Sequence, residues 1–263
     1  MDELESELDA GFKSLLFDGI FSHPGVLEIE RALICLASDE RVQSLAPGAA
    51  DRLADLQAAR ESGDTDKRET ELLSLYLILH GAGAGYRGEE REKINNRQGI
   101  ECLPGGIVPL VLSSRLIGPQ SVVADLGCGN GLQGLLLQSL QPHRRTIQAE
   151  LSGSLISTGR LYQEVLGLKG DSVYWFHGDI FDLDLEGIDL IYLYRPVRPS
   201  GQGTGVYRRV AARLSTLSHA VSVVSMADCL KGFLGLDFCT LYQNYSLSIF
   251  TTAWRKPGTA VEC

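Results

Sequence analysis

Apolar residues recur at helical spacing through the first part of the chain. Ser22 before Pro24 indicates a helix start, and the residues that follow keep one apolar face: Val26, Ile29, Leu33 and Leu36. The polar stretch from Glu61 to Glu69 predicts a loop, which leads into a second apolar helix from Leu72 to Leu79. We therefore expect residues 1–118 to form a helical region.

A segment rich in glycine and mixed charge interrupts this helical region. It runs from Gly81 to Gly99 and contains Tyr86 and Arg87. This composition is typical of a hinge, an inert linker or a lid over a site, and the sequence leaves the three open.

From Ser121 onward, short strand-like runs alternate with helical patterns. The runs that predict strands are Val122 to Leu126, Thr146 to Leu151, Ser172 to His177, Ile188 to Tyr194 and Ala220 to Met226. The helices between them are expected at Leu132 to Leu140, Ser154 to Leu168 and Val206 to Leu217. This alternation predicts a parallel sheet with helices on both faces.

The end of the chain breaks this alternation. Two strand-like runs between Phe238 and Trp254 leave no room for a helix, so they predict an antiparallel hairpin. The expected fold class is α/β, with a seven-stranded, mostly parallel sheet that ends in this hairpin, helices on both faces, and the N-terminal helical region.

Composition narrows the classes of protein only modestly. The 263 residues are 44% hydrophobic and 22% charged, and the formal net charge of −9 disfavours broad binding to phosphate backbones. The acidic start, MDELESELD, lacks the pattern of a signal peptide, and the apolar run from Leu72 is too short to span a bilayer. We expect a cytoplasmic protein that does not bind membranes. The six cysteines include no C-x-x-C pair, so we expect no metal site.

The stretch VVADLGCGNG, from Val122 to Gly131, places an acid directly before a glycine loop. Two nucleotide ligands compete for this loop. The series from Gly129 to Gly134 matches the dinucleotide pattern G-x-G-x-x-G, with Glu150 near the position of a ribose-binding acid. However, Asp125 would repel a pyrophosphate, whereas it would attract the sulfonium and ammonium groups of S-adenosylmethionine.

The stretch resembles the first motif of the class I, Rossmann-like S-adenosylmethionine-dependent methyltransferases, and the resemblance covers about Ser121 to Arg255. It implies a cofactor-binding core over residues 119–263, with residues 1–118 as a cap or substrate region. The residues implied at the methionine part are Asp125, Gly127, Cys128, Gly129 and Gly131; those at the ribose are Glu150 and its neighbour Leu151; and those at the adenine are Asp179 and Ile180.

The fourth strand ends at Tyr194-Arg195-Pro196-Val197, where the family faces the methyl group and the acceptor. Members that methylate adenine amino groups or protein glutamine carry a polar residue, two prolines and an aromatic residue there, which this chain lacks. Tyr194 and Arg195 are the candidate catalytic residues, with Tyr194 beside the sulfonium and Arg195 pairing with an acidic acceptor. The alternative is that Tyr194 is a wall and Arg195 a solvated charge.

We therefore expect an S-adenosylmethionine-dependent methyltransferase. A small-molecule acceptor is preferred over nucleic acid or protein because the chain is acidic and its helical region is suited to enclosing a ligand. Two alternatives stay open: an NAD(P)-dependent oxidoreductase, and a non-catalytic scaffold that binds S-adenosylmethionine.

Overall fold

The central sheet is the expected one. A computed structural model describes Ser6, Ala10 and residues 20–83, 85–86, 88–95, 106–194, 196–197, 203–226, 230–235, 238–244 and 247–252. Its strands are β1 (Val122–Leu126), β2 (Arg145–Glu150), β3 (Val173–His177), β4 (Leu190–Tyr194), β5 (Ser222–Met226), β6 (Cys239–Asn244) and β7 (Leu247–Thr251).

The strands form one seven-stranded sheet in the order β3-β2-β1-β4-β5-β7-β6. Strands β1 to β5 pair in parallel, whereas β7 is antiparallel to both β5 and β6. The order reverses at β1, which has β2 on one side and β4 on the other. The sheet is Rossmann-like, and the predicted fold class is confirmed. The reversal creates the crevice in which open α/β sheets bind ligands.

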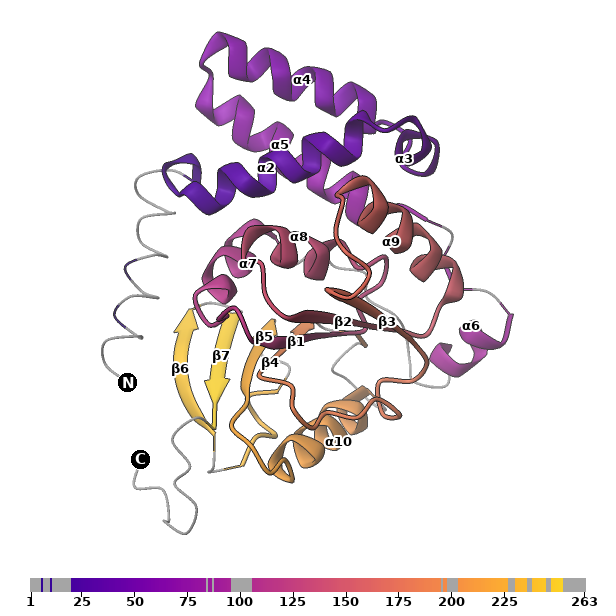
Figure 1. Cartoon of the computed structure of the whole chain (residues 1–263), viewed down its shortest axis with the longest axis vertical. Helices are drawn as coiled ribbons and strands as arrows, with labels where there is room; N and C mark the ends of the chain where they lie inside the picture. Colours follow the sequence, from indigo (N-terminus) through magenta and orange to yellow (C-terminus); the bar gives the residue numbers. More distant parts are fainter. Residues whose placement is uncertain are drawn as a thin grey trace.

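Helices cover both faces of the sheet (Figure 1). One face carries α7 (Ile107–Ser114), α8 (Leu132–Leu140) and α9 (Gly153–Val165), and the other carries α10 (Gly203–Ser215). The helices α8, α9 and α10 begin within three residues of the predicted positions because their apolar periodicity sets the face that must be buried.

The N-terminal helices form a further layer outside α7, α8 and α9 (Figure 1). This layer contains η1 (Ile20–Ser22), α2 (Pro24–Ser38), α3 (Glu40–Leu45), α4 (Ala49–Ser62) and α5 (Thr65–His80). The short helix α6 (Gly88–Asn95) follows, and its Glu90 contacts Gly153 at the start of α9. The helical region is present as expected, although the domain boundary near residue 118 stays a prediction. The residue that caps α2 is His23 rather than Ser22, since the His23 Nδ1 accepts the N–H of Gly25.

The loop predicted from Glu61 to Glu69 was wrong. Only Gly63 and Asp64 separate α4 from α5. Gly63 takes the left-handed conformation that ends α4, and the Asp64 carboxylate caps α5 by accepting the N–H of Lys67 at 3.0 Å. The polar residues after Asp64 therefore form the first, solvent-facing turn of α5.

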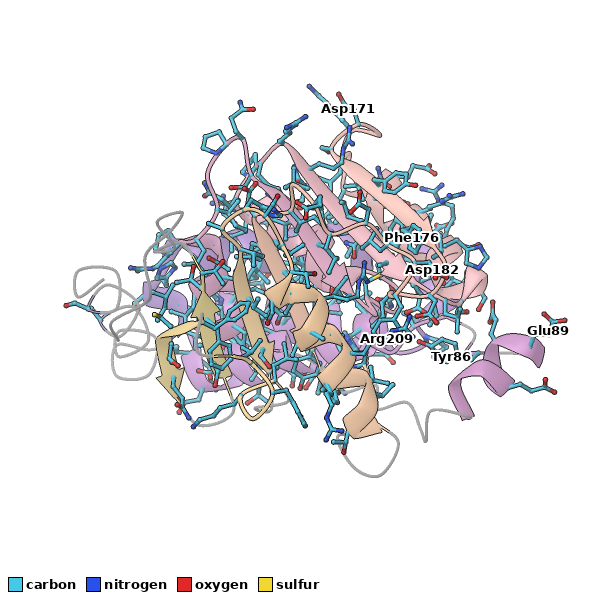
Figure 2. All side chains as sticks on the ribbon, turned by 90° about the horizontal axis from the view of Figure 1, so that it is seen from below. Tyr86, Glu89, Asp171, Phe176, Asp182 and Arg209 are labelled. Atoms are coloured by element: carbon cyan, nitrogen blue, oxygen red, sulfur yellow. The ribbon has the colours of Figure 1, made fainter. Side chains whose placement is uncertain are left out.

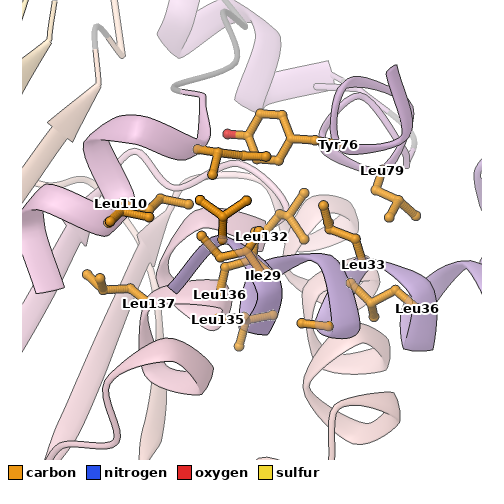
Figure 3. Packing of buried hydrophobic residues seen from close by; sticks show 14 of the residues in the cluster. Ile29, Leu33, Leu36, Tyr76, Leu79, Leu110, Leu132, Leu135, Leu136 and Leu137 are labelled. Atoms are coloured by element: carbon orange, nitrogen blue, oxygen red, sulfur yellow. The ribbon is translucent and has the colours of Figure 1, made fainter. Parts of the chain in front are cut away.

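A single apolar cluster joins the N-terminal layer to the sheet (Figure 3). Its members come from α2, α5, α7, α8 and the sheet, and include Ile29, Leu33, Leu79, Leu110, Leu132 and Leu136. A second cluster fills the opposite face, between the sheet and α10. Within the described part of the chain, no helix combines the length and the apolarity needed to cross a bilayer.

Candidate ligand-binding site at the carboxyl ends of the strands

The loop between β1 and α8 folds back onto the end of β2. The N–H groups of Gly127 and Cys128 both donate to the carbonyl of Ala149, at 2.9 and 3.1 Å. Gly127, Gly129 and Gly131 all have positive φ angles, of 76°, 61° and 71°. Side chains other than glycine rarely adopt this conformation, so the backbone of the loop dictates the glycine series.

Two of these glycines also lie so close to a bulky side chain that a side chain of their own would clash with it. A Cβ atom on Gly131 would lie 2.4 Å from the Trp175 ring, and one on Gly127 would lie 2.6 Å from Pro196. In contrast, a Cβ atom on Gly129 would meet nothing within 4 Å. The middle of the loop is therefore the part that another molecule can approach.

Asp125 lies beneath the loop in a row of polar side chains. Its neighbours in register are Gln148 on β2 and Tyr192 on β4, and all three are buried. The N–H of Gly134, in the first turn of α8, donates to the Asp125 carboxyl. Within the part of the chain that the structure describes, Asp125 Oδ2, Gln148 Oε1 and the Tyr192 hydroxyl have no hydrogen-bond partner. Burial, reinforced by the charge of Glu150, raises the pKa of Asp125 to about 7.

Glu150 ends β2 with its carboxyl group buried and hydrogen-bonded. Its Oε2 accepts the N–H of Gly129 at 2.9 Å, and its Oε1 accepts the N–H of Ser152 at 2.8 Å. The Tyr86 side chain also hydrogen-bonds this carboxyl. Burial raises the pKa of Glu150 despite these donors. Two buried carboxyl groups that repel each other favour a cation between or near them.

A pocket opens beside the loop at the carboxyl ends of the strands. Its walls are Tyr86, Gly127, Glu150, Leu151, Gly178, Asp179, Ile180, Pro196, Val197 and Val206. Asp179 also shapes the turn after β3, because its Oδ1 accepts the N–H of Phe181 at 3.1 Å. The pocket therefore has two acids, two glycines and an apolar wall from α10 and from the residues that follow β4.

The structure brings five of the predicted cofactor residues into this one pocket, namely Gly127, Glu150, Leu151, Asp179 and Ile180. Asp125, Cys128, Gly129 and Gly131 form the loop and its base without lining the pocket. Tyr194 ends β4 and is half-buried, whereas Arg195 and Arg87 lie outside the described residues.

Asn130 ties the loop to the N-terminal layer, which sequence reasoning missed. Its amide nitrogen donates to the carbonyls of Leu79, His80 and Ala82, at 2.8, 3.1 and 3.1 Å. These carbonyls are the last acceptors of α5 and of the residues that follow it, so Asn130 caps the end of that helix. The sequence gives no signal for this pairing, because 48 to 51 positions separate the partners.

Two further polar side chains near the loop, those of Cys128 and His177, make contacts typical of structural residues. Burial raises the pKa of the Cys128 thiol well above its ordinary value, which leaves no reactive thiolate. The His177 Nε2 lies 3.1 Å from the Leu151 carbonyl. The described residues contain no group of three histidine, cysteine or acidic side chains arranged to hold a metal ion.

No protein-family model matches the sequence, and no curated protein matches it either. Among solved structures, an RNA methyltransferase from Salinibacter ruber, crystallised with S-adenosyl-L-homocysteine, is 20% identical; the match covers 58% of this chain and 94% of that one, with a TM-score of 0.42.

Two further similar structures have lower identity. The tRNA methyltransferase TrmK of B. subtilis is 14% identical, with 54% of this chain and 64% of that one covered and a TM-score of 0.40. Precorrin-6y C5,15-methyltransferase from Geobacter metallireducens is 15% identical, with 57% and 86% covered and a TM-score of 0.38. These three proteins are methyltransferases. Likeness at this level assigns no ligand, activity or partner to this chain.

Proposed function

We propose that this protein is an S-adenosylmethionine-dependent methyltransferase. One observation carries the proposal: Gly127 of the glycine loop, Glu150 and the Asp179-Ile180 pair line a single pocket. The pocket lies beside the point where the strand order reverses, at the edge where ligands of such sheets bind.

The residues present fit this cofactor. The open space over Gly129 admits its methionine part, and the buried carboxyl groups of Asp125 and Glu150 attract its positive charges. Glu150 would accept hydrogen bonds from the ribose hydroxyls, and Asp179 with Ile180 would hold the adenine. When bound, the cofactor supplies an electrophilic methyl group. The protein then aligns the acceptor and excludes water.

The same geometry disfavours a dinucleotide. Pyrophosphates bind at a helix N-terminus through free backbone N–H groups. Here the carboxyl group of Asp125 accepts the N–H of Gly134 in the first turn of α8. A pyrophosphate would therefore have to compete with a buried acid for the same donors, so the oxidoreductase alternative ranks second.

For the acceptor, we propose a small molecule that enters beside Tyr194. The net charge of −9 opposes long phosphate chains. Pro196, Val197 and Val206 line the pocket on that side and favour an apolar or planar acceptor. Tyr194 and Arg195 stay the proposed residues for positioning it. A scaffold that binds the cofactor without transferring its methyl group would bind S-adenosylhomocysteine but methylate none of the acceptors offered.

Calorimetric titration with S-adenosylhomocysteine, with NAD⁺ in parallel, tests the cofactor. We expect binding of the first ligand only. Glu150→Gln should weaken it about ten-fold or more, because the ribose loses a charged acceptor. Glu61→Gln, on the exposed end of α4, is the matched control and should bind like the unaltered protein. Binding of NAD⁺ alone would replace this proposal with the oxidoreductase.

A further inference from the structure

Tyr86 reaches the ribose side of the pocket from the segment between α5 and α6. Its side chain is half-buried, lines the pocket together with Glu150, and hydrogen-bonds the Glu150 carboxyl. Figure 2 shows Tyr86 between α6 and α10. The residue therefore belongs to the N-terminal region but acts on the end of β2.

The hydrogen bonds on Glu150 show why this contact matters. A carboxylate offers about four lone-pair positions on its two oxygens. The backbone N–H groups of Gly129 and Ser152 and the Tyr86 hydroxyl occupy three of them, whereas a ribose diol brings two donors. The backbone donors are fixed by the loop and by the start of α9. A further pair of hydroxyl donors therefore needs the Tyr86 hydroxyl to leave.

The chain on both sides of Tyr86 lies close against α9. Before it, Gly83 has a φ angle of 107°, and a Cβ atom there would lie 2.7 Å from the Thr158 hydroxyl oxygen. After it, the Glu90 Oε1 accepts the N–H of Gly153 at 2.9 Å, at the first residue of α9. A carboxylate at this end of a helix is favoured by the helix dipole as well.

We propose that Tyr86 is an internal competitor for the ribose position, and that it determines the affinity of the pocket for ribose-bearing ligands. The Tyr86 hydroxyl and a ribose diol use the same acceptor, the Glu150 carboxyl group. A ribose-bearing ligand must therefore break the hydrogen bond from Tyr86 before it forms its own. Glu90 assists by holding the segment in place. This inference rests on the proposed function for the identity of the ligand.

Titration of S-adenosylhomocysteine into the unaltered protein and into Tyr86→Phe tests the proposal. Phenylalanine keeps the ring but removes the competing donor, so the Kd should fall about five-fold. Tyr174→Phe is the matched control, since Tyr174 is 51% exposed on β3, and its Kd should not change. An unchanged or higher Kd in Tyr86→Phe would overturn the proposal, since Tyr86 would then be inert or hold the ligand itself.

A second variant separates release of the segment from loss of the hydroxyl. Glu90→Ala should lower the Kd in the same direction, and combining it with Tyr86→Phe should add little, because both changes free the same carboxylate. Fully additive effects would contradict a shared cause. If S-adenosylhomocysteine binds the unaltered protein but Tyr86→Phe changes nothing, only this inference fails. If neither the unaltered protein nor any of the variants binds S-adenosylhomocysteine, the proposed function fails.

Discussion

Among single residues, the buried polar side chains beneath the loop lower the stability of the fold. Gln148, Asp125 and Tyr192 occupy paired positions on three neighbouring strands, and each has a buried atom without a partner in the described part of the chain. Burial of the Asp125 carboxyl favours its protonated form, and the nearby charge of Glu150 strengthens this preference. The fold therefore loses stability in keeping negative charge near the pocket.

Asp125→Asn should stabilise the protein at high pH. The pKa of Asp125 is about 7 in the fold against an ordinary value of 3.8, so the unaltered protein loses stability as the pH rises from about 4 through about 7. The variant has no charge to bury. In urea unfolding it should match the unaltered protein near pH 4 and exceed it by about 2–4 kcal/mol at pH 8.

Asp182→Asn is the control for this pH dependence, because Asp182 is exposed (Figure 2). Its difference from the unaltered protein should stay constant between pH 4 and pH 8. An Asp125→Asn difference that is equally flat would mean that the Asp125 carboxyl is not forced into its neutral form by the fold.

At the scale of elements, the end of α5 is joined to the glycine loop. Asn130 donates to three carbonyls there, and the Tyr162 hydroxyl donates to one of them, Leu79, at 2.9 Å. The Gln133 amide donates to the Tyr76 hydroxyl at 3.0 Å one turn earlier on α5. Because these partners are buried, the loop and the helix end hold each other in position.

Asn130→Ala should lower the free energy of unfolding by about 2 kcal/mol, since it removes the amide donor that the carbonyls of Leu79, His80 and Ala82 share. Asn130→Asp should cost more, because it places a carboxylate against carbonyl oxygens at the negative end of a helix. Urea unfolding measures both, and hydrogen exchange at residues 81–83 should accelerate. An aspartate variant as stable as the alanine variant would show that the donor contacts do not hold this end of α5.

At the scale of the whole molecule, the N-terminal helices and the sheet share one core. Leu132, Leu135 and Leu136 of α8 are fully buried, and the same cluster contains Ile29 and Leu33 of α2 (Figure 3). Removal of the N-terminal layer would expose one side of α8 to water. The pocket residues of the core therefore depend on helices that do not line the pocket.

A chain of residues 119–263 alone should not show a cooperative unfolding transition. It lacks α2, α5 and α7, so a broad apolar surface of α8 stays exposed and favours association. Circular dichroism during heating and size-exclusion chromatography measure this, with the 263-residue protein as the reference. A monomeric fragment with a sharp transition would show instead that residue 118 is the boundary of an independent domain.

Local patterns in the sequence are sufficient to predict the fold class, the strands and the glycine loop. Strand and helix periodicity is a local property, and positive φ angles at Gly127, Gly129 and Gly131 are local requirements, so both are visible in a short stretch. The loop expected from Glu61 to Glu69 failed because polar residues suit the exposed first turn of a helix as well as a loop. Local composition does not separate the two.

The way in which distant segments meet at the pocket depends on tertiary packing. Tyr86 on Glu150 and Asn130 on the end of α5 join residues far apart in the chain, and no periodicity marks either pairing. The row of Gln148, Asp125 and Tyr192, each with one buried atom that lacks a hydrogen-bond partner in the described part of the chain, depends on strand register in the same way. The physical reason is that a sequence pattern fixes which face of an element is buried, whereas packing in three dimensions fixes which partner that face meets.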